Sequence, residues 1–284
     1  MLKRNQDRES RDIQSRYAHF SGGIFVCLLV MLSACTLSQE PPIAALATRS
    51  LPTAVVMIEP SPDVAGWTVI APGLETRTLN NGDLLGQLNV VRIDPARFAF
   101  RAHYRPGEPL GLNGWRDILS DAVTIINANF FDPSLLAQGL LVVDGVTYGQ
   151  SFVNRGGMFT VIGNAVRVRS TIREPYQGEA LDQAIQAFPM LVEDGLAIPR
   201  SERGDRRTRR SAIAQDQQGR ILLLATPLLG LTLADLSMAL TQPELAIEIA
   251  FNLDGGGSTM LYARTAFSLV SLDAVPAVLA AYPR

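Results

Sequence analysis

Beyond Gly66 the chain consists mostly of short strand-like runs divided by tight turns, and this pattern limits it to a fold rich in sheet. The run 98–103 alternates apolar and polar residues, as a half-buried strand does. Asp144-Gly145, within 142–146, predicts a hairpin because this pair tolerates the positive φ of a two-residue turn. Further strands are expected over 67–70 and 88–93, and further hairpins over 159–168, turning at Gly163-Asn164, and 213–225, turning at Gln218-Gly219.

Helix signals are fewer. Thr232 is a suitable N-cap for a helix over 233–240, with Asp235 in its first turn. Shorter helical segments are expected over 115–120 and 181–188. Runs of strands with occasional helices predict an α+β fold, with a mixed, largely antiparallel sheet in a single domain over 64–284.

The N-terminus has the layout of a secretory signal, with five basic residues ahead of the nine-residue apolar run 24–32. Nine residues fall short of the roughly 20 that a membrane-spanning helix needs, and a short buried helix is the alternative. Leu32-Ser33-Ala34-Cys35 resembles the lipobox of bacterial lipoproteins, whose cysteine is acylated, for example with palmitate, and begins the mature chain. That resemblance implies a signal peptide over 1–34 and a membrane anchor at Cys35.

The residue after the cysteine bears on location. It is Thr36 and not the aspartate that retains some lipoproteins at the inner membrane, so the resemblance implies the outer membrane of a bacterial envelope, facing the periplasm or the exterior. Residues 35–63 are rich in proline and lack an apolar period, which predicts a flexible tether. Some 28 residues of such a chain would reach about 30 Å.

Composition removes several kinds of chemistry. The single lysine is Lys3, and the two cysteines are Cys27 and Cys35, so the mature chain would have no lysine side chain for a Schiff base and no thiolate nucleophile. His103 would be its one histidine; a Ser-His-Asp triad would have to recruit it, and a packed strand residue is the better interpretation. The formal charge is −2 and the sequence indicates no broad basic face, which argues against a nucleic-acid partner.

The most informative motif begins where an apolar run ends in Asn252-Leu253-Asp254. It continues with three glycines and a hydroxyl residue, Gly255, Gly256, Gly257 and Ser258. Consecutive glycines mark an unusual φ or a close approach of the backbone to another group. A phosphate loop would need a lysine before the hydroxyl residue, and a calcium loop starting at Asn252 would need a glutamate where Ala263 stands. A plain loop between strands remains the alternative.

Two further segments carry polar groups next to apolar runs. Asn127 and Asn129 follow the run 123–126 on one face, with Asp132 close behind, although such residues are also ordinary turn formers. Arg210 ends an arginine-rich stretch and leads directly into an apolar strand, where its guanidinium could bind a phosphate or carboxylate. The other arginines of that stretch are expected on a solvated loop.

Taken in order, these motifs resemble the phosphodiester glycosidase family over about 64–284. The resemblance rests on Trp67 with 72–75, and on 127–132, 188–195, 209–214, 230–236 and 252–258. Many members have glycines where this chain has Ala128 and Asn129, and a glycine is common at Ala214. The resemblance implies hydrolysis of a sugar-1-phosphodiester at the anomeric carbon, on phosphate-linked glycans.

The resemblance implies that Asp254 is the base or nucleophile and that Asp132 is a candidate second carboxylate. Arg210 would hold the phosphate, while the backbone of 255–258 packs against sugar or phosphate. Asn127 and Asn129 would orient sugar hydroxyls, and Asn252 is included among the substrate-binding residues. The sequence requires no cofactor, and a divalent cation at an all-oxygen site on Asp254 or Asp132 stays open.

Two other functions remain open at this point. One is a non-catalytic lipoprotein that binds phosphorylated polysaccharide. The other is a metal-dependent phosphodiesterase that breaks the phosphorus–oxygen bond.

Overall fold

The computed structural model describes residues 66–80, 87–199, 205–227 and 229–284. The expected signal peptide, Cys35 and the tether lie outside these residues. The chain from Ile58 to Arg284 forms one compact unit. Its described strands pair antiparallel throughout, and with two short α-helices among the described residues the α+β expectation is confirmed.

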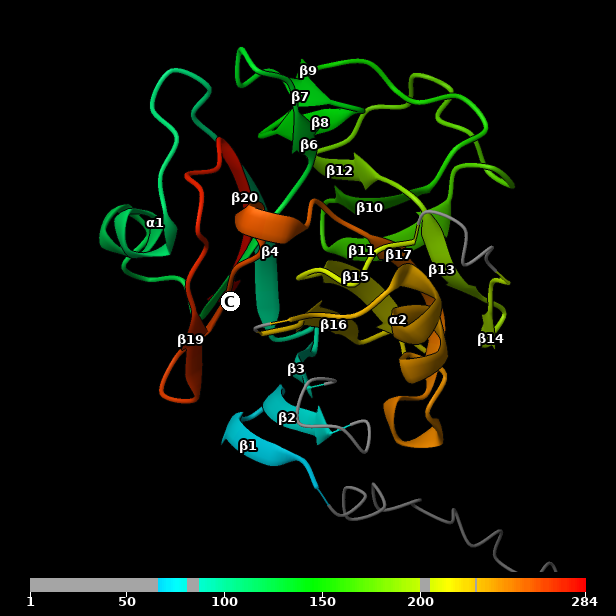
Figure 1. Ribbon diagram of the computed structural model, residues 1–284. Helices are drawn as coiled ribbons and strands as arrows, with labels where there is room; N and C mark the ends of the chain where they lie inside the picture. The colour runs from blue at the N-terminus through cyan, green and yellow to red at the C-terminus, as the bar shows by residue number, and fades with distance from the viewer. Residues whose placement is uncertain (1–65, 81–86, 200–204, 228) are drawn as a thin grey trace, which may run out of the picture. The chain divides into compact units, whose positions relative to one another are not determined.

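The largest sheet has eight strands in the order β1-β2-β3-β16-β15-β17-β13-β14 (Figure 1). Their bounds are β1 Thr68–Ala71, β2 Leu74–Asn80, β3 Gln87–Ile93, β16 Ile221–Ala225, β15 Ser211–Asp216, β17 Ile247–Asn252, β13 Met190–Glu193 and β14 Leu196–Ala197. Two five-stranded sheets pack against it, in the orders β11-β10-β12-β8-β9 and β19-β18-β5-β20-β4.

The smaller sheets use short strands. The first comprises β11 Ala165–Ser170, β10 Gly157–Ile162, β12 Gln183–Ala187, β8 Leu141–Val143 and β9 Val146–Tyr148. The second comprises β19 Phe267–Leu269, β18 Leu261–Ala263, β5 Thr124–Asn127, β20 Ala277–Pro283 and β4 Phe98–Tyr104. A separate pair, β6 Phe130–Phe131 and β7 Ala137–Gln138, follows β5 in the chain.

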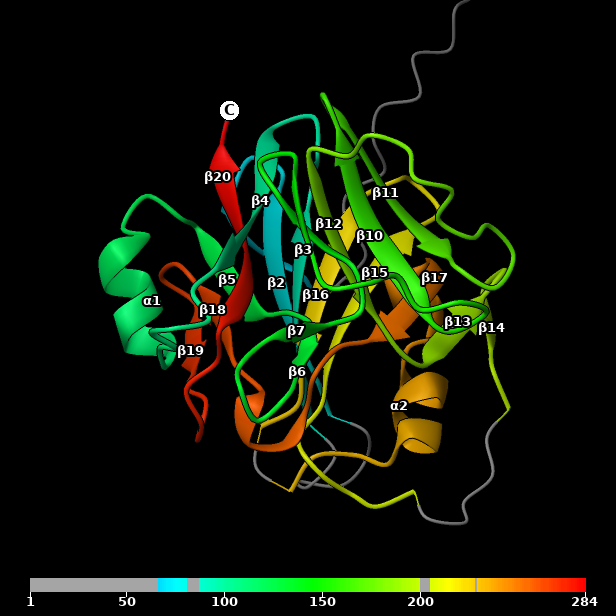
Figure 2. The ribbon, with the colours of Figure 1, turned by 90° about the horizontal axis from the view of Figure 1, so that it is seen from above.

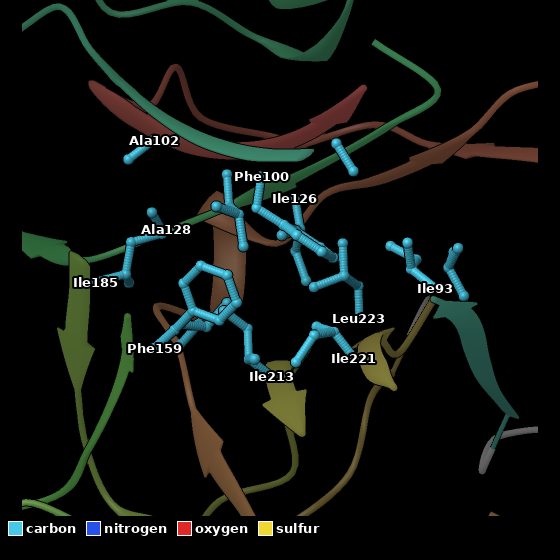
Figure 3. Close-up of a cluster of buried hydrophobic side chains, with 14 of the residues drawn as sticks. Ile93, Phe100, Ala102, Ile126, Ala128, Phe159, Ile185, Ile213, Ile221 and Leu223 are labelled. Atoms are coloured by element: carbon cyan, nitrogen blue, oxygen red, sulfur yellow. The ribbon is translucent and has the colours of Figure 1, made fainter. Parts of the chain in front are cut away.

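The main core lies where the three sheets face one another (Figure 3). Strand β16 shows how one sequence supplies two cores, because successive strand residues point to opposite faces. Ile221, Leu223 and Ala225 join the main core, whereas Leu222 and Leu224 join a second cluster on the opposite face. The main core includes Ile93, Ile213 and Leu223 from the large sheet, Phe159 and Ile185 from the sheet of β10, and Phe100 and Ile126 from the sheet of β5.

Helices cover two outer faces. The helix α2 (Leu233–Ala239) packs against β13 and closes the second cluster with Leu236. Its N-cap is Thr232, whose hydroxyl accepts from the Asp235 N–H, as expected. The helix α1 (Leu112–Ile118) buries Trp115 against the sheet of β5 and β20 (Figure 2). No helix in the described part of the chain is long and apolar enough to cross a membrane.

Most local expectations are confirmed. The three hairpins form as β8–β9, β10–β11 and β15–β16, and Asp144 and Gly145 take φ of 47° and 79° in the first turn. The expected strands correspond to β1, β3 and β4. His103 is a packed residue of β4 that hydrogen-bonds the Tyr282 hydroxyl at 2.9 Å, and burial lowers its pKa.

The expected helix over 181–188 is wrong. Residues Gln183–Ala187 form β12, a strand between β10 and β8 with all five residues buried. Burial on both faces removes the alternation that identifies a strand in sequence.

A buried ion pair joins the first strands of the large sheet. The Arg92 Nε donates to Glu75 Oε2 at 2.6 Å, and the guanidinium lies 3.8 Å from the centre of the Trp67 ring. The two charged side chains are only 4% and 11% exposed. Breaking an ion pair buried this deeply is strongly destabilising, because the remaining charge loses a close partner that water does not replace.

We therefore expect Glu75→Ala to lower the free energy of unfolding by about 3 kcal/mol, measured by urea denaturation. Glu174→Ala is the matched control, because Glu174 pairs with Arg167 where both side chains are about half exposed. That loss should stay below about 1 kcal/mol. Equal losses would contradict the importance of the buried pair.

Candidate active site

Three of the sequence motifs meet at the side chain of Asn127. This residue ends β5, and its Nδ2 donates to the backbone carbonyl of Asp254 at 2.7 Å. Its Oδ1 accepts from the Ser211 hydroxyl at 2.7 Å and from the Met260 N–H at 3.1 Å. Asn127 is 1% exposed and both ends of its carboxamide are bonded within the protein, an arrangement that holds the backbone of Asp254 in place. The expected contact with a sugar hydroxyl stays a prediction.

Asp254 leaves the end of β17 with its carboxyl group partly buried. Its backbone N–H donates to the Ala128 carbonyl at 3.2 Å, and its Oδ1 accepts from the Gly255 N–H at 2.9 Å. Burial raises the pKa of this carboxyl; the Asp273 charge raises it further, while hydrogen bonds from Ser258 and Gly255 act in the opposite direction. A carboxyl shifted in this way and fixed by two donors is a candidate for acid, base or nucleophile chemistry.

Close contacts within the protein restrict two glycines of the loop, and a positive φ restricts the third. A Cβ on Gly255 would lie 2.9 Å from the Arg209 carbonyl, and one on Gly257 would lie 1.9 Å from an Asp273 carboxylate oxygen. Gly256 has a φ of +61° and donates its N–H to the Arg209 carbonyl at 2.8 Å. The close approach expected of this backbone is therefore made to Arg209 and Asp273.

Asp273 is a site residue that sequence reasoning missed. The N–H groups of Leu272 and Asp273 both donate to the Gly257 carbonyl, at 2.7 and 3.0 Å, and this bond pair brings an exposed loop back onto the glycines. Nothing in the local sequence signals this long-range contact. The result is a second carboxylate close enough to act on the pKa of Asp254.

Arg209 places a buried positive charge behind the glycine loop. Its Nη2 donates to the carbonyls of Thr259 and Val270 at 2.8 and 2.7 Å, and the residue is 7% exposed. Burial lowers the pKa of the guanidinium, which stays protonated in proteins. No carboxylate of the described residues pairs with it, so its charge adds to a positive potential at the loop.

Arg210, the residue expected to hold phosphate, is anchored by its own surroundings. Its Nε donates to the Leu231 carbonyl at 3.1 Å, and its Nη2 lies 3.3 Å from Asp205. Asp205 in turn accepts from the N–H groups of Leu233 and Ala234 at the start of α2. Within the described residues Nη1 has no hydrogen-bond partner, and it is the atom that remains for an anion.

Asn129 and Asn252 each present a buried oxygen. Their Nδ2 groups donate to carbonyls two residues apart, those of Gln186 at 2.9 Å and Phe188 at 3.1 Å. Among the described residues neither Oδ1 has a hydrogen-bond partner. A buried acceptor without a donor is costly, so these two oxygens suit a ligand hydroxyl.

Asp132 lies in a different environment. Its Oδ1 accepts from the N–H groups of Ser134 and Leu136, both at 2.9 Å, and so closes the turn between β6 and β7. Asp132 lines a cavity beside this turn, whereas Asp273 is the carboxylate whose charge acts on the pKa of Asp254. In the described ranges no three His, Cys, Asp or Glu side chains are grouped to hold a metal ion.

The family model of the phosphodiester glycosidases matches residues 120–279, which is 160 of the 284 residues and contains all the groups just described around Asp254. The chain belongs to the phosphodiester glycosidase family. The sequence resemblance is thereby confirmed, and it extends over the central strand β5, the glycine loop and the Asp273 contact.

Two solved structures have a fold similar to that of this chain. The catalytic domain of zebrafish N-acetylglucosamine-1-phosphodiester alpha-N-acetylglucosaminidase, auto-inhibited by its pro-peptide, has a TM-score of 0.59 and 17% identity, covering 78% of this chain and 87% of that domain. A hypothetical protein from Synechocystis has a TM-score of 0.52 and 18% identity, covering 74% of this chain and 62% of that one. A comparison with curated proteins found no match to this chain.

Replacing the glycine that touches Asp273 tests the carboxylate pair. Gly257→Ala should displace the flexible, exposed Asp273 side chain without unfolding the domain, because the clash is with a side-chain end. With that negative charge moved away, the pKa of Asp254 should fall. We expect the acidic limb of the pH–activity profile to move to lower pH.

Gly107→Ala is the control, since a Cβ there meets nothing within 4 Å. An unchanged acidic limb in a folded Gly257→Ala variant would contradict the coupling of the two carboxyls.

Removing the Asn127 side chain tests its positioning role. Asn127→Ala leaves the Ser211 hydroxyl, the Met260 N–H and the Asp254 carbonyl without this partner, so we expect a loss of about 3 kcal/mol in unfolding free energy and a lower kcat. Ser211→Ala removes one of these bonds and should cost about 1 kcal/mol. A stable Asn127→Ala protein with unchanged kcat would refute the role.

Proposed function

We propose that this chain hydrolyses a sugar-1-phosphodiester at the anomeric carbon, releasing a sugar and a phosphomonoester. The observation that carries the proposal is the partly buried Asp254 carboxyl, fixed at the glycine loop with its pKa raised by burial and by Asp273. Membership of the phosphodiester glycosidase family supports the same chemistry. The substrate class is a phosphate-linked glycan of the cell envelope or its surroundings.

The two carboxyls suit cleavage through an oxocarbenium-like transition state. Glycosidases use a pair of Asp or Glu residues, one as acid and the other as base or nucleophile. A phosphate ester is a weakly basic leaving group, so its departure needs little protonation. In this proposal the ionised Asp254, held by the Gly255 N–H and the Ser258 hydroxyl, attacks the anomeric carbon or activates a water, and Asp273 is the second carboxylate.

Positive charge and free acceptors complete the proposed site. The departing phosphate would be stabilised by the buried charge of Arg209 and bound by Nη1 of Arg210. The unpartnered oxygens of Asn129 and Asn252 would accept hydrogen bonds from sugar hydroxyls. These assignments keep Asn129, Arg210 and Asn252 as substrate-binding residues and move Asn127 to a positioning role.

For location, we propose a lipid anchor at Cys35 in the outer membrane of a bacterial envelope. The lipobox-like Leu32–Cys35 sequence supports the anchor, and the proline-rich residues 35–63 would hold the domain about 30 Å from the membrane surface.

The central substitution is Asp254→Asn. It should lower hydrolysis of a sugar-1-phosphodiester at least about a hundredfold, since an amide is neither base nor nucleophile. Asp117→Asn, at an exposed position of α1, is the control and should leave activity unchanged. Equal activity of Asp254→Asn and the unsubstituted chain would refute the assignment, and binding of these substrates without turnover would favour a non-catalytic glycan-binding lipoprotein.

The same substitution should stabilise the fold at neutral pH. A carboxyl whose pKa is raised on folding binds protons more tightly when folded, so it destabilises the domain once pH rises above its unfolded pKa. Asp254→Asn should therefore raise the melting temperature at pH 7, and the gain should shrink as pH falls toward about 4. A gain that is independent of pH would contradict the raised pKa.

A further inference from the structure

A cavity of about 570 Å³ opens beside the hairpin of β6 and β7. Its lining includes Tyr104, Asp132, Gln138, Tyr148, Gln150 and Phe152, and we call it the tyrosine pocket. Cavities of this size with aromatic walls and a few polar groups are typical of sites for small organic ligands.

Two tyrosines form an aromatic wall of the pocket. The rings of Tyr104 and Tyr148 are 4.9 Å apart between centroids. The Tyr104 hydroxyl donates to the Leu135 carbonyl at 3.3 Å and accepts from the Ala137 N–H at 3.0 Å, which fixes that ring. Tyr148 is 38% exposed on the short strand β9, so part of its ring is available to a ligand.

The polar groups of the pocket favour an uncharged, hydroxyl-rich ligand. Gln138, Gln150 and Ser151 provide amide and hydroxyl groups that both donate and accept. Asp132 is the one carboxylate in the lining, and neither lysine nor arginine is among the lining residues. Among the lining residues a phosphate would meet the like charge of Asp132 and no cation, since Arg155 lies over the rings of Phe152 and Phe188 and is not in the lining. A neutral sugar could place its C–H face on the tyrosine rings and form hydrogen bonds to the rim through its hydroxyls.

The pocket is built on the same segments as the candidate active site. Phe152 contacts Phe188 with ring centroids 5.3 Å apart, and the Phe188 carbonyl accepts from Asn252, two residues before Asp254. Residues 127–132 lead directly from the Asp254 contact to the pocket, a path of at most about 18 Å. In both Figure 1 and Figure 2 the orange turn over 256–258 lies near β6.

We propose that the tyrosine pocket binds an uncharged sugar unit of the glycan, apart from the phosphate-linked unit at Asp254. The pocket is thus a subsite for the uncharged part of a longer substrate, and Tyr148 is its stacking surface. The proposal rests on the proposed function only in naming a glycan as the substrate.

The test is direct binding of maltotriose, cellotriose and chitotriose to the full chain by calorimetry. These trisaccharides contain no phosphodiester, so binding is measured whether or not the chain hydrolyses one. We expect at least one to bind, with Tyr148→Ala raising its Kd about tenfold and Tyr148→Phe changing it less than about twofold. Val146→Ala, on the same face of β9 but outside the lining, should bind as the unsubstituted chain does.

Gln150→Ala supplies a second variant at an exposed rim position and should also raise the Kd, by about threefold. Failure of all three sugars to bind would overturn the proposal, as would equal binding by Tyr148→Ala. Displacement of the bound sugar by inorganic phosphate would overturn the assignment of an uncharged ligand.

Discussion

The candidate active site depends on one buried side chain, the carboxamide of Asn127. It holds the Asp254 backbone from β5, accepts from Ser211 on β15 and accepts from Met260 beyond the glycine loop. Two sheets thus share one hydrogen-bonded centre, and the positions of their strand ends are coupled. Because a buried amide that loses its partners is costly, this arrangement fixes Asp254 more firmly than a surface loop could.

Around that centre the protein keeps charges that do not favour the folded state. Asp254 is partly buried close to another carboxylate, and Arg209 is buried without a carboxylate partner among the described residues. Such placements cost stability, and they are common where a site must act on a charged substrate. A phosphodiester carries a negative charge that Arg209 can offset, while the anomeric carbon becomes positive as the bond breaks and is stabilised by the carboxylates.

Local sequence signals predicted local structure well. Asp144-Gly145 and the Thr232 cap each depend on neighbours in the chain, and both form as expected. The strand at 183–187 could not be predicted from hydrophobic periodicity, because a strand buried on both faces has the same apolar pattern as a buried helix. The meeting of Asn127 and Asp254 was expected from the family resemblance, but the burial of Asn127 was not. Asp273 reaches the site only through backbone bonds to Gly257, a contact that no local pattern encodes.

In the proposed reaction the bond that breaks lies between the anomeric carbon and the phosphate oxygen attached to it. Hydrolysis of a sugar-1-phosphodiester in water enriched with heavy oxygen tests it directly, with the products analysed by mass spectrometry. Attack at carbon, assisted by Asp254, places the label in the released sugar. Label in the released phosphate would mean attack at phosphorus, and would contradict the proposed reaction.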